Sequence, residues 1–234
     1  MVTQATAPRT APRVAQGGPP LGVLGIVVAA LFVAGLVLST ALAGGTPFPS
    51  PFGEAGPIVA YFQDHDVAVR VGGAFQFGAA IPLAIYAATV SSRLHHLGIR
   101  APGATIALAG GLLAATFLAC SGLISWALSQ PGVTTAPDLI RPLQLLAFAA
   151  GGPGHVVPLG LLLAGIAVPG LLAGLLPRWL AWAGLVIAAV AELATLSLLL
   201  EGAAYLLPVA RFAGLAWLIA VGFKLPLHRP RLNG

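Results

Sequence analysis

The chain has 234 residues, of which 58% are hydrophobic and 7% are charged. So few charges cannot cover the surface of a protein of this length in water. The composition therefore excludes a water-soluble globular domain and indicates a polytopic membrane protein. The formal net charge is +5. Because the basic residues are spread over several short segments, this charge reflects membrane topology and does not indicate nucleic-acid binding.

Six apolar stretches succeed one another along the chain, and each is close to the ~20 residues needed to cross ~30 Å of hydrocarbon. They predict an all-α fold, a six-helix transmembrane bundle. One transmembrane domain is expected at 21–225, between a disordered N-terminal segment at 1–20 and a short basic tail at 226–234. The stretches cover residues 21–43, 67–90, 104–128, 155–175, 180–200 and 205–223.

The basic residues predict the orientation of this bundle. With a cytoplasmic N-terminus and alternating helices, eight of the eleven basic residues fall in the cytoplasm, and all six acidic residues fall outside or within the spans. This is the positive-inside pattern, so both termini are expected to be cytoplasmic. The eight are Arg9, Arg13, Arg93, Arg100, Arg178, Lys224, Arg229 and Arg231.

The first apolar stretch and the overall composition bear on the location. Residues 21–43 exceed the roughly 7–15 residues of a signal-peptide core, which favours a signal anchor. Cleavage stays an alternative, because Ala41-Leu42-Ala43 resembles a cleavage site. One Lys against ten Arg, with abundant Ala, Gly, Leu and Pro, is typical of a high-GC bacterial genome. A bacterial plasma membrane is therefore the expected location.

The fourth apolar segment is too long for one crossing. Residues 139–175 would form about 55 Å of helix at the usual rise per residue. Gly151-Gly152-Pro153-Gly154 lies in its middle, where glycine permits unusual torsions and proline lacks a backbone donor. We expect a broken fourth helix, with 138–150 as a separate outer helix and 155–175 as the crossing half. Such a break survives at membrane depth where it is buried in protein or faces a wet cavity.

One outer loop is long enough to have a role of its own. The segment 44–66 opens with prolines at 47, 49 and 51, which force an extended backbone. It continues through Ile58-Val59-Ala60-Tyr61-Phe62, which could form a short amphipathic helix. Two interpretations stay open. The loop either lies flat on the outer leaflet or caps an outward-facing pocket.

Among the polar residues inside the apolar stretches, which are costly there and normally face the bundle interior, Glu192 and Arg211 are the most telling. Counted from the outer turn between the last two helices, Glu192 and Arg211 lie at nearly the same depth on neighbouring antiparallel helices. We expect them to form an ion pair, since an isolated buried charge costs several kcal/mol. The pair would either fix the register of the two helices or act as a proton- or anion-responsive site.

Other polar residues are expected at the same end of the bundle. Gln76, Gln144 and His155 join Glu192 and Arg211 as the candidate ligand-binding residues. In addition, Arg70 and Arg141 each follow an acid by one helical turn, Asp66 and Asp138, which predicts two solvated surface pairs.

Sequence motifs of enzymes are missing. The chain has no zinc-protease, phosphate-loop, dinucleotide-binding or paired-cysteine pattern, and its only cysteine is Cys120. A lone His155 within a span is more often a packing residue than a ligand. We therefore assign no catalytic residues, no metal and no cofactor, and an intramembrane enzyme is a minor alternative.

Three motifs carry a resemblance to a known group. Gly151-Gly152-Pro153-Gly154 before a span, Leu176-Pro177-Arg178-Trp179-Leu180, and the run from Tyr205 through Pro208 to Arg211-Phe212 are similar to a family of six-helix integral membrane proteins of actinobacteria, classified under a domain of unknown function. The similarity extends from about residue 20 to residue 225. It implies the six-span fold and no particular chemistry.

The sequence thus predicts a membrane protein of undefined activity that binds a ligand or acts as an accessory protein, with an outer-leaflet polar pocket for a lipid or small amphiphile. The alternative is a small proton-coupled transporter with Glu192 as the coupling group. Few polar residues lie in the inner halves of the spans, which argues against a continuous path. Membrane lipids are the expected partners, and a homo-oligomer is compatible with the sequence.

The topology can be tested by cysteine accessibility. In a Cys120→Ser background, Ser50→Cys should react with a membrane-impermeant maleimide from outside intact cells. Ser92→Cys should react only after the membrane is opened. Labelling of both positions from one side would show that the assigned topology is wrong.

Overall fold

The computed structural model describes residues 18–228, and these form helices joined by short connections, with no β-strand in this range. Six helical segments are long and apolar enough to cross a membrane, which confirms the all-helical fold with six candidate spans. The predicted segment at 1–20 and tail at 226–234 lie largely outside the described residues. The main helices are α1 (Leu21–Leu42), α2 (Ala55–Asp64), α3 (Asp66–His96), α4 (Gly103–Leu128), α5 (Pro131–Thr134), α6 (Pro137–Ala149), α7 (His155–Leu172), α8 (Arg178–Leu193) and α9 (Leu206–Lys224).

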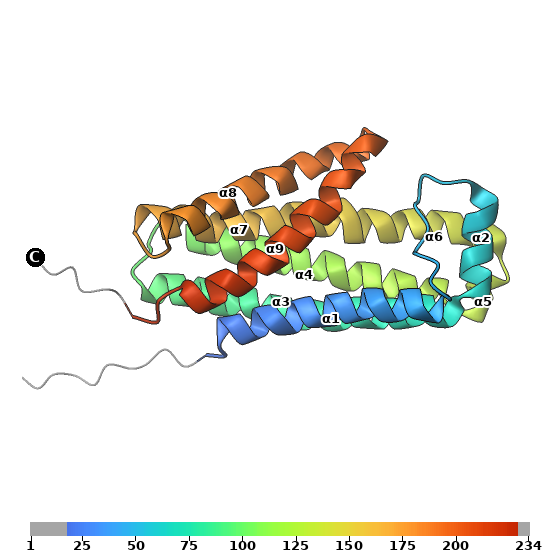
Figure 1. The fold of residues 1–234 in the computed structure, drawn as a ribbon, viewed down its shortest axis with the longest axis horizontal. Coiled ribbons are helices and arrows are strands. Elements are labelled where there is room, and N and C mark those ends of the chain that lie inside the picture. Colours follow the sequence, from blue (N-terminus) through green and yellow to red (C-terminus); the bar gives the residue numbers. More distant parts are fainter. Residues whose placement is uncertain (1–17, 229–234) are drawn as a thin grey trace, which may run out of the picture.

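The spans form a closed ring in chain order. Each packs against the next, from α1 on α3 through α4, α7 and α8 to α9, and α9 returns to pack on α1. In Figure 1, α1 begins and α9 ends at one end of the bundle, whereas α2, α5 and α6 lie at the other. At that second end α8 and α9 diverge from the remaining helices, and α9 crosses the bundle obliquely.

Glycines allow the tightest helix contacts. A Cβ atom at Gly165 of α7 would lie 2.5 Å from the backbone nitrogen of Ala107 in α4, and one at Gly110 of α4 would lie 2.6 Å from the backbone nitrogen of Leu162 in α7. Within a bilayer, helix association depends on such close backbone packing, because lipid tails are as apolar as the side chains themselves. The α4–α7 contact therefore requires small residues.

The fourth span is one long element with an irregular centre. Between α6 and α7, residues Ala150–Gly154 form a π-helical segment, and Gly152 has φ −81° and ψ −105°, outside helical values. In Figure 1 α6 and α7 follow each other along nearly the same line. The irregular torsions lie within the Gly-Gly-Pro-Gly run, but Pro137–Leu172 is one continuous helical segment of 36 residues, so the predicted break into two separate helices stays a prediction.

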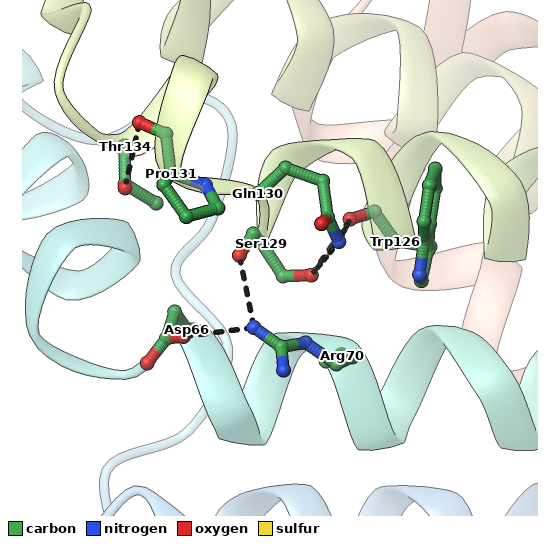
Figure 2. A network of polar contacts seen from close by, with 7 residues as sticks. All are labelled: Asp66, Arg70, Trp126, Ser129, Gln130, Pro131 and Thr134. Carbon is green, nitrogen blue, oxygen red and sulfur yellow. Dashed lines mark hydrogen bonds and ion pairs between the residues drawn. The ribbon is translucent and has the colours of Figure 1, made fainter.

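The end of the bundle beyond α6 carries the 44–54 connection, called the strap below. Gly44 and Gly45 have φ values of 63° and 89°, which reverse the chain after α1. Nearby, Arg70 donates to the Asp66 carboxylate at 3.1 Å and to the Ser129 carbonyl at 3.4 Å, which ties α3 to the end of α4 (Figure 2). Gln130 extends this network by donating to the Trp126 carbonyl at 3.0 Å. The end of the bundle that carries the strap and this network is called the strap end below.

The rest of the bundle has a largely apolar interior, although Ser91 and Arg93 near the end of α3 are also buried. Leu83, Leu159, Leu163 and Leu218 are at most 1% exposed and belong to one continuous core cluster. The hydroxyl of Tyr86, also fully buried, donates to the Leu218 carbonyl at 2.8 Å. The half of the bundle away from the strap is therefore closely packed and largely apolar inside.

The close α4–α7 contact gives a stability test. Gly165→Ala should lower the free energy of unfolding by about 1–3 kcal/mol, because the added methyl group meets backbone atoms that cannot rotate away. Gly78→Ala in α3 is the control, since its Cβ would meet nothing within 4 Å and alanine favours the helix. Thermal unfolding in detergent measures both. Equal melting temperatures for the two variants would contradict the packing.

Candidate functional site

A cavity of about 270 Å³ opens at the strap end, between the strap, α3, α4, α6 and α9. Its walls combine one cation, two amides and two hydroxyl groups with apolar side chains, and none of the lining residues is acidic. The lining residues are Phe48, Pro49, Pro51, Gln76, Ser121, Ser125, Gln144, Ala147, Phe148, Gly151, Gly152, Ala204, Leu207, Pro208 and Arg211.

Helical spacing explains why these side chains converge. On α6 and the π-helical segment, Gln144, Phe148 and Gly151 lie four and three residues apart and so share one face. Pro208 and Arg211 are related in the same way on α9. Each element therefore turns a single stripe toward the cavity.

Arg211 supplies the positive charge of the cavity. Its Nη2 donates to the carbonyl of Gly151, and its guanidinium lies 5.1 Å from the centre of the Phe32 ring. Its Nε is buried and has no hydrogen-bond partner. Within residues 18–228 Arg211 forms no ion pair, because the one found there joins Arg70 to Asp66. The charge of this guanidinium is therefore not neutralised by the protein around it.

Two amides and a hydroxyl form the polar part of the wall. Gln144 is 1% exposed and donates from Nε2 to the Pro49 carbonyl at 3.1 Å, while its Oε1 is buried without a partner. The Ser121 hydroxyl lies 3.0 Å from the Ala147 carbonyl and 3.3 Å from Oε1 of Gln76, and it donates to one of them at a time. The wall thus offers both donors and acceptors.

The strap covers the cavity and is fastened to α6. Besides the Gln144 bond, Arg141 donates to the Gly53 carbonyl at 3.1 Å, and the Phe52 and Phe148 rings meet edge to face at 5.4 Å. Phe48 packs on α2, where desolvation by burial raises the pKa of Tyr61 above its usual value. The strap is therefore an ordered cover, anchored on both α2 and α6.

Three of the five candidate residues meet in this cavity: Gln76, Gln144 and Arg211. His155 and Glu192 are not among its lining residues. His155 is 2% exposed, and its Nδ1 donates to the Ala114 carbonyl at 2.9 Å. Because a carbonyl only accepts, Nδ1 carries the proton. His155 thus fastens the start of α7 to α4.

The predicted ion pair between Glu192 and Arg211 is wrong. Glu192 is exposed, at the end of α8, and a Cβ on Gly160 of α7 would lie 3.1 Å from its Oε1. Arg211 points instead to the π-helical segment. Helical rise gave both residues a similar depth, but depth does not determine the direction in which a side chain points.

The two predicted surface pairs have different outcomes. Arg70 and Asp66 form the expected i,i+4 pair at 3.1 Å, and both side chains are about half exposed, at 46% and 40%. Arg141 makes no ion pair with Asp138 and contacts the strap. Its preference for the Gly53 carbonyl follows from the strap lying over α6.

Sequence reasoning missed two parts of the site. Ser121 and Ser125 lie four residues apart on the cavity face of α4, a spacing that could have identified them as a polar stripe within an apolar helix. The Gly151 carbonyl had no signal of its own, because a backbone acceptor carries no residue signature. It follows only from the interruption at Gly152.

The arrangement is suited to recognition by hydrogen bonds and charge. Residues 18–228 contain no group of three His, Cys, Asp or Glu side chains that could hold a metal ion. Cys120 is exposed, and the cavity wall contains neither a carboxylate nor a histidine to serve as a base. A cation, amides and hydroxyls can bind polar groups by charge and by hydrogen bonds.

Comparisons with known proteins leave the family open. No protein-family model matches the chain, and no curated protein or solved structure matches it either. The resemblance to the actinobacterial six-helix family therefore stays a prediction.

The separation of Glu192 from Arg211 can be tested by a double-mutant cycle. The effects of Glu192→Gln and Arg211→Gln on the free energy of unfolding should add to within about 0.5 kcal/mol, as expected for residues that share no partner. Chemical or thermal unfolding of both single variants and of the double variant measures this. A coupling energy of about 1 kcal/mol or more would show that the two side chains do interact.

Proposed function

We propose that this protein binds a lipid or small amphiphile at the strap end, as a binding or accessory protein of a bacterial plasma membrane. The observation that carries the proposal is a cavity within a membrane-spanning bundle that combines an unneutralised guanidinium with apolar walls. A polar group of the ligand would form hydrogen bonds with the polar atoms of the cavity wall. The hydrocarbon chain of the same ligand would stay among the lipid tails. With the basic residues facing the cytoplasm, the strap end faces outside.

The size and mouth of the cavity favour an amphiphile over a fully enclosed ligand. Its volume of about 270 Å³ is just below the roughly 300–1,000 Å³ of sites that enclose a drug-sized molecule. Pro208 lines the cavity and is exposed, at the end of the bundle where α8 and α9 diverge (Figure 1). A headgroup fits inside while its chain leaves between the helices.

The interrupted fourth span serves the site. The irregular torsions at Gly152 coincide with a Gly151 carbonyl that accepts from Arg211. Such π-helical irregularities cost stability and occur frequently at functional sites. We infer that the interruption serves to anchor the cation at the cavity wall.

Binding is favoured over proton-coupled transport by two features. The half of the bundle away from the strap is packed with buried leucines, and the residues that line the cavity lie toward the strap end. Glu192, the coupling group that transport would require, lies outside the cavity. In proteoliposomes with a pH gradient, no proton flux above that of empty vesicles is expected, and a flux lost in Glu192→Gln would favour the transporter instead.

The proposal is tested by filling the cavity. Wild-type protein purified in mild detergent should retain about one lipid or amphiphile in native mass spectrometry. Ala204→Trp, at the cavity wall, should lose it because the indole occupies the headgroup space. Ala203→Trp is the control, since Ala203 is equally half-buried but does not line the cavity.

Retention by the control and loss in Ala204→Trp would support a ligand in this cavity. Equal retention by both variants would place the bound lipid on the outer surface of the bundle. A wild-type protein that carries no ligand and takes up none from added lipid would overturn the proposal.

A further inference from the structure

We infer that the ligand of this cavity carries an oxyanion and a hydroxyl group side by side. The inference rests on the proposed function and names the chemistry of its ligand. Two side-chain atoms of the lining residues are buried without a hydrogen-bond partner, and they have opposite character: the donor Nε of Arg211 and the acceptor Oε1 of Gln144. Buried polar groups almost always have a hydrogen-bond partner in folded proteins, because a buried donor or acceptor without one costs free energy.

Arg211 calls for an anion. The Gly151 carbonyl takes up Nη2, which leaves the Nε–H and the remaining N–H groups to bind a second acceptor. Planar N–H pairs of this kind match the two oxygens of a carboxylate or phosphate. No acidic residue lines the cavity to serve as that acceptor. The counter-charge must therefore come with the ligand.

Gln144 calls for a donor. Its amide orientation is fixed, because the Pro49 carbonyl can only accept and so must face Nε2. Oε1 therefore points to the other side, where it needs an N–H or O–H group. A simple oxyanion has no such group to offer and would leave Oε1 unsatisfied. A hydroxyl on the same headgroup satisfies it, as in a phosphate ester of a polyol.

A second unpartnered guanidinium atom at this end lies outside the cavity. Arg141 also has a buried nitrogen without a partner, Nη1, but Arg141 is not among the lining residues and its Nη2 holds the strap at Gly53. It therefore adds no second anion site within the cavity. Among the lining residues, only Arg211 and Gln144 have buried side-chain atoms without a hydrogen-bond partner, one a donor and the other an acceptor.

Three lipids with identical chains separate charge from hydroxyl. Phosphatidylglycerol carries both features, phosphatidylmethanol carries the same charge without a hydroxyl, and phosphatidylcholine is zwitterionic. Displacement of a chain-labelled fluorescent phosphatidylglycerol from the full-length protein in detergent measures their affinities. Phosphatidylglycerol should bind about fivefold more tightly than phosphatidylmethanol, as one neutral hydrogen bond provides. Phosphatidylmethanol should bind about tenfold more tightly than phosphatidylcholine, because the trimethylammonium group of choline cancels the net charge of the phosphate that faces Arg211.

Two variants assign each preference to its residue. Gln144→Met should abolish the difference between phosphatidylglycerol and phosphatidylmethanol and keep the preference for an anion. Arg211→Gln should abolish the preference for an anion. The matched controls are Gln63→Met, whose amide binds the Thr134 carbonyl, and Arg70→Gln, which removes a charge at the same end. Neither control residue lines the cavity, and both should retain the full wild-type order.

The outcomes separate this inference from the proposed function. If no lipid displaces the probe, binding itself fails. If all three lipids bind equally, or if a control loses the order as the cavity variants do, binding stands and the assigned headgroup chemistry is wrong. Water-soluble glycerol phosphate tests the source of that chemistry. Competition at the concentration of the lipid assigns the specificity to the free headgroup, and competition only at far higher concentration assigns it to a lipid.

Discussion

The contact between Arg211 and the Gly151 carbonyl joins the two irregular parts of this bundle. Backbone groups inside a bilayer have no water to bind, so an interrupted helix must find its partners within the protein. Arg211 supplies one donor at the interruption, and the Ser121 hydroxyl supplies another to the Ala147 carbonyl one turn earlier. The fourth span can therefore depart from regular winding only because α4 and α9 bring these two side chains to it.

The cavity follows from the same arrangement. To place Arg211 against the π-helical segment, α9 crosses the bundle obliquely, and its start diverges with α8 from the remaining helices at the strap end (Figure 1). At the opposite end α9 packs closely on α1, where a Cβ on Gly222 would lie 2.5 Å from the backbone nitrogen of Gly22. The space that opens toward the strap is closed by Phe48 and the prolines that follow it. One end is tightly packed and largely apolar inside, and the other contains a cavity with polar groups in its wall.

Much of this fold could be predicted from the sequence, because hydropathy over about 20 residues is set by the bilayer itself. The amides Gln76 and Gln144 could also be predicted, since polar groups within a span turn to the interior. The direction of Glu192 could not be predicted. Its depth was estimated from helical rise, but α8 ends at Leu193 and two short 3₁₀ turns follow, so the path to α9 is not helical. A glutamate at the end of a helix that diverges from the bundle can reach the surface, whereas a glutamate in the middle of a packed helix cannot.

The separation of Glu192 from Arg211 is itself informative about the site. A cation that serves only to fix helix register is best stabilised by pairing with a carboxylate, because an unpaired buried charge costs several kcal/mol. The neighbouring helix carries such a carboxylate, yet Glu192 is exposed and does not line the cavity. Arg211 instead contacts a carbonyl and an aromatic ring, which stabilise a guanidinium without cancelling its charge. The positive charge thus stays available at the cavity wall. Under the proposed function, an anion that enters the cavity would meet a donor already held in place, and little free energy would be lost to its reorganisation.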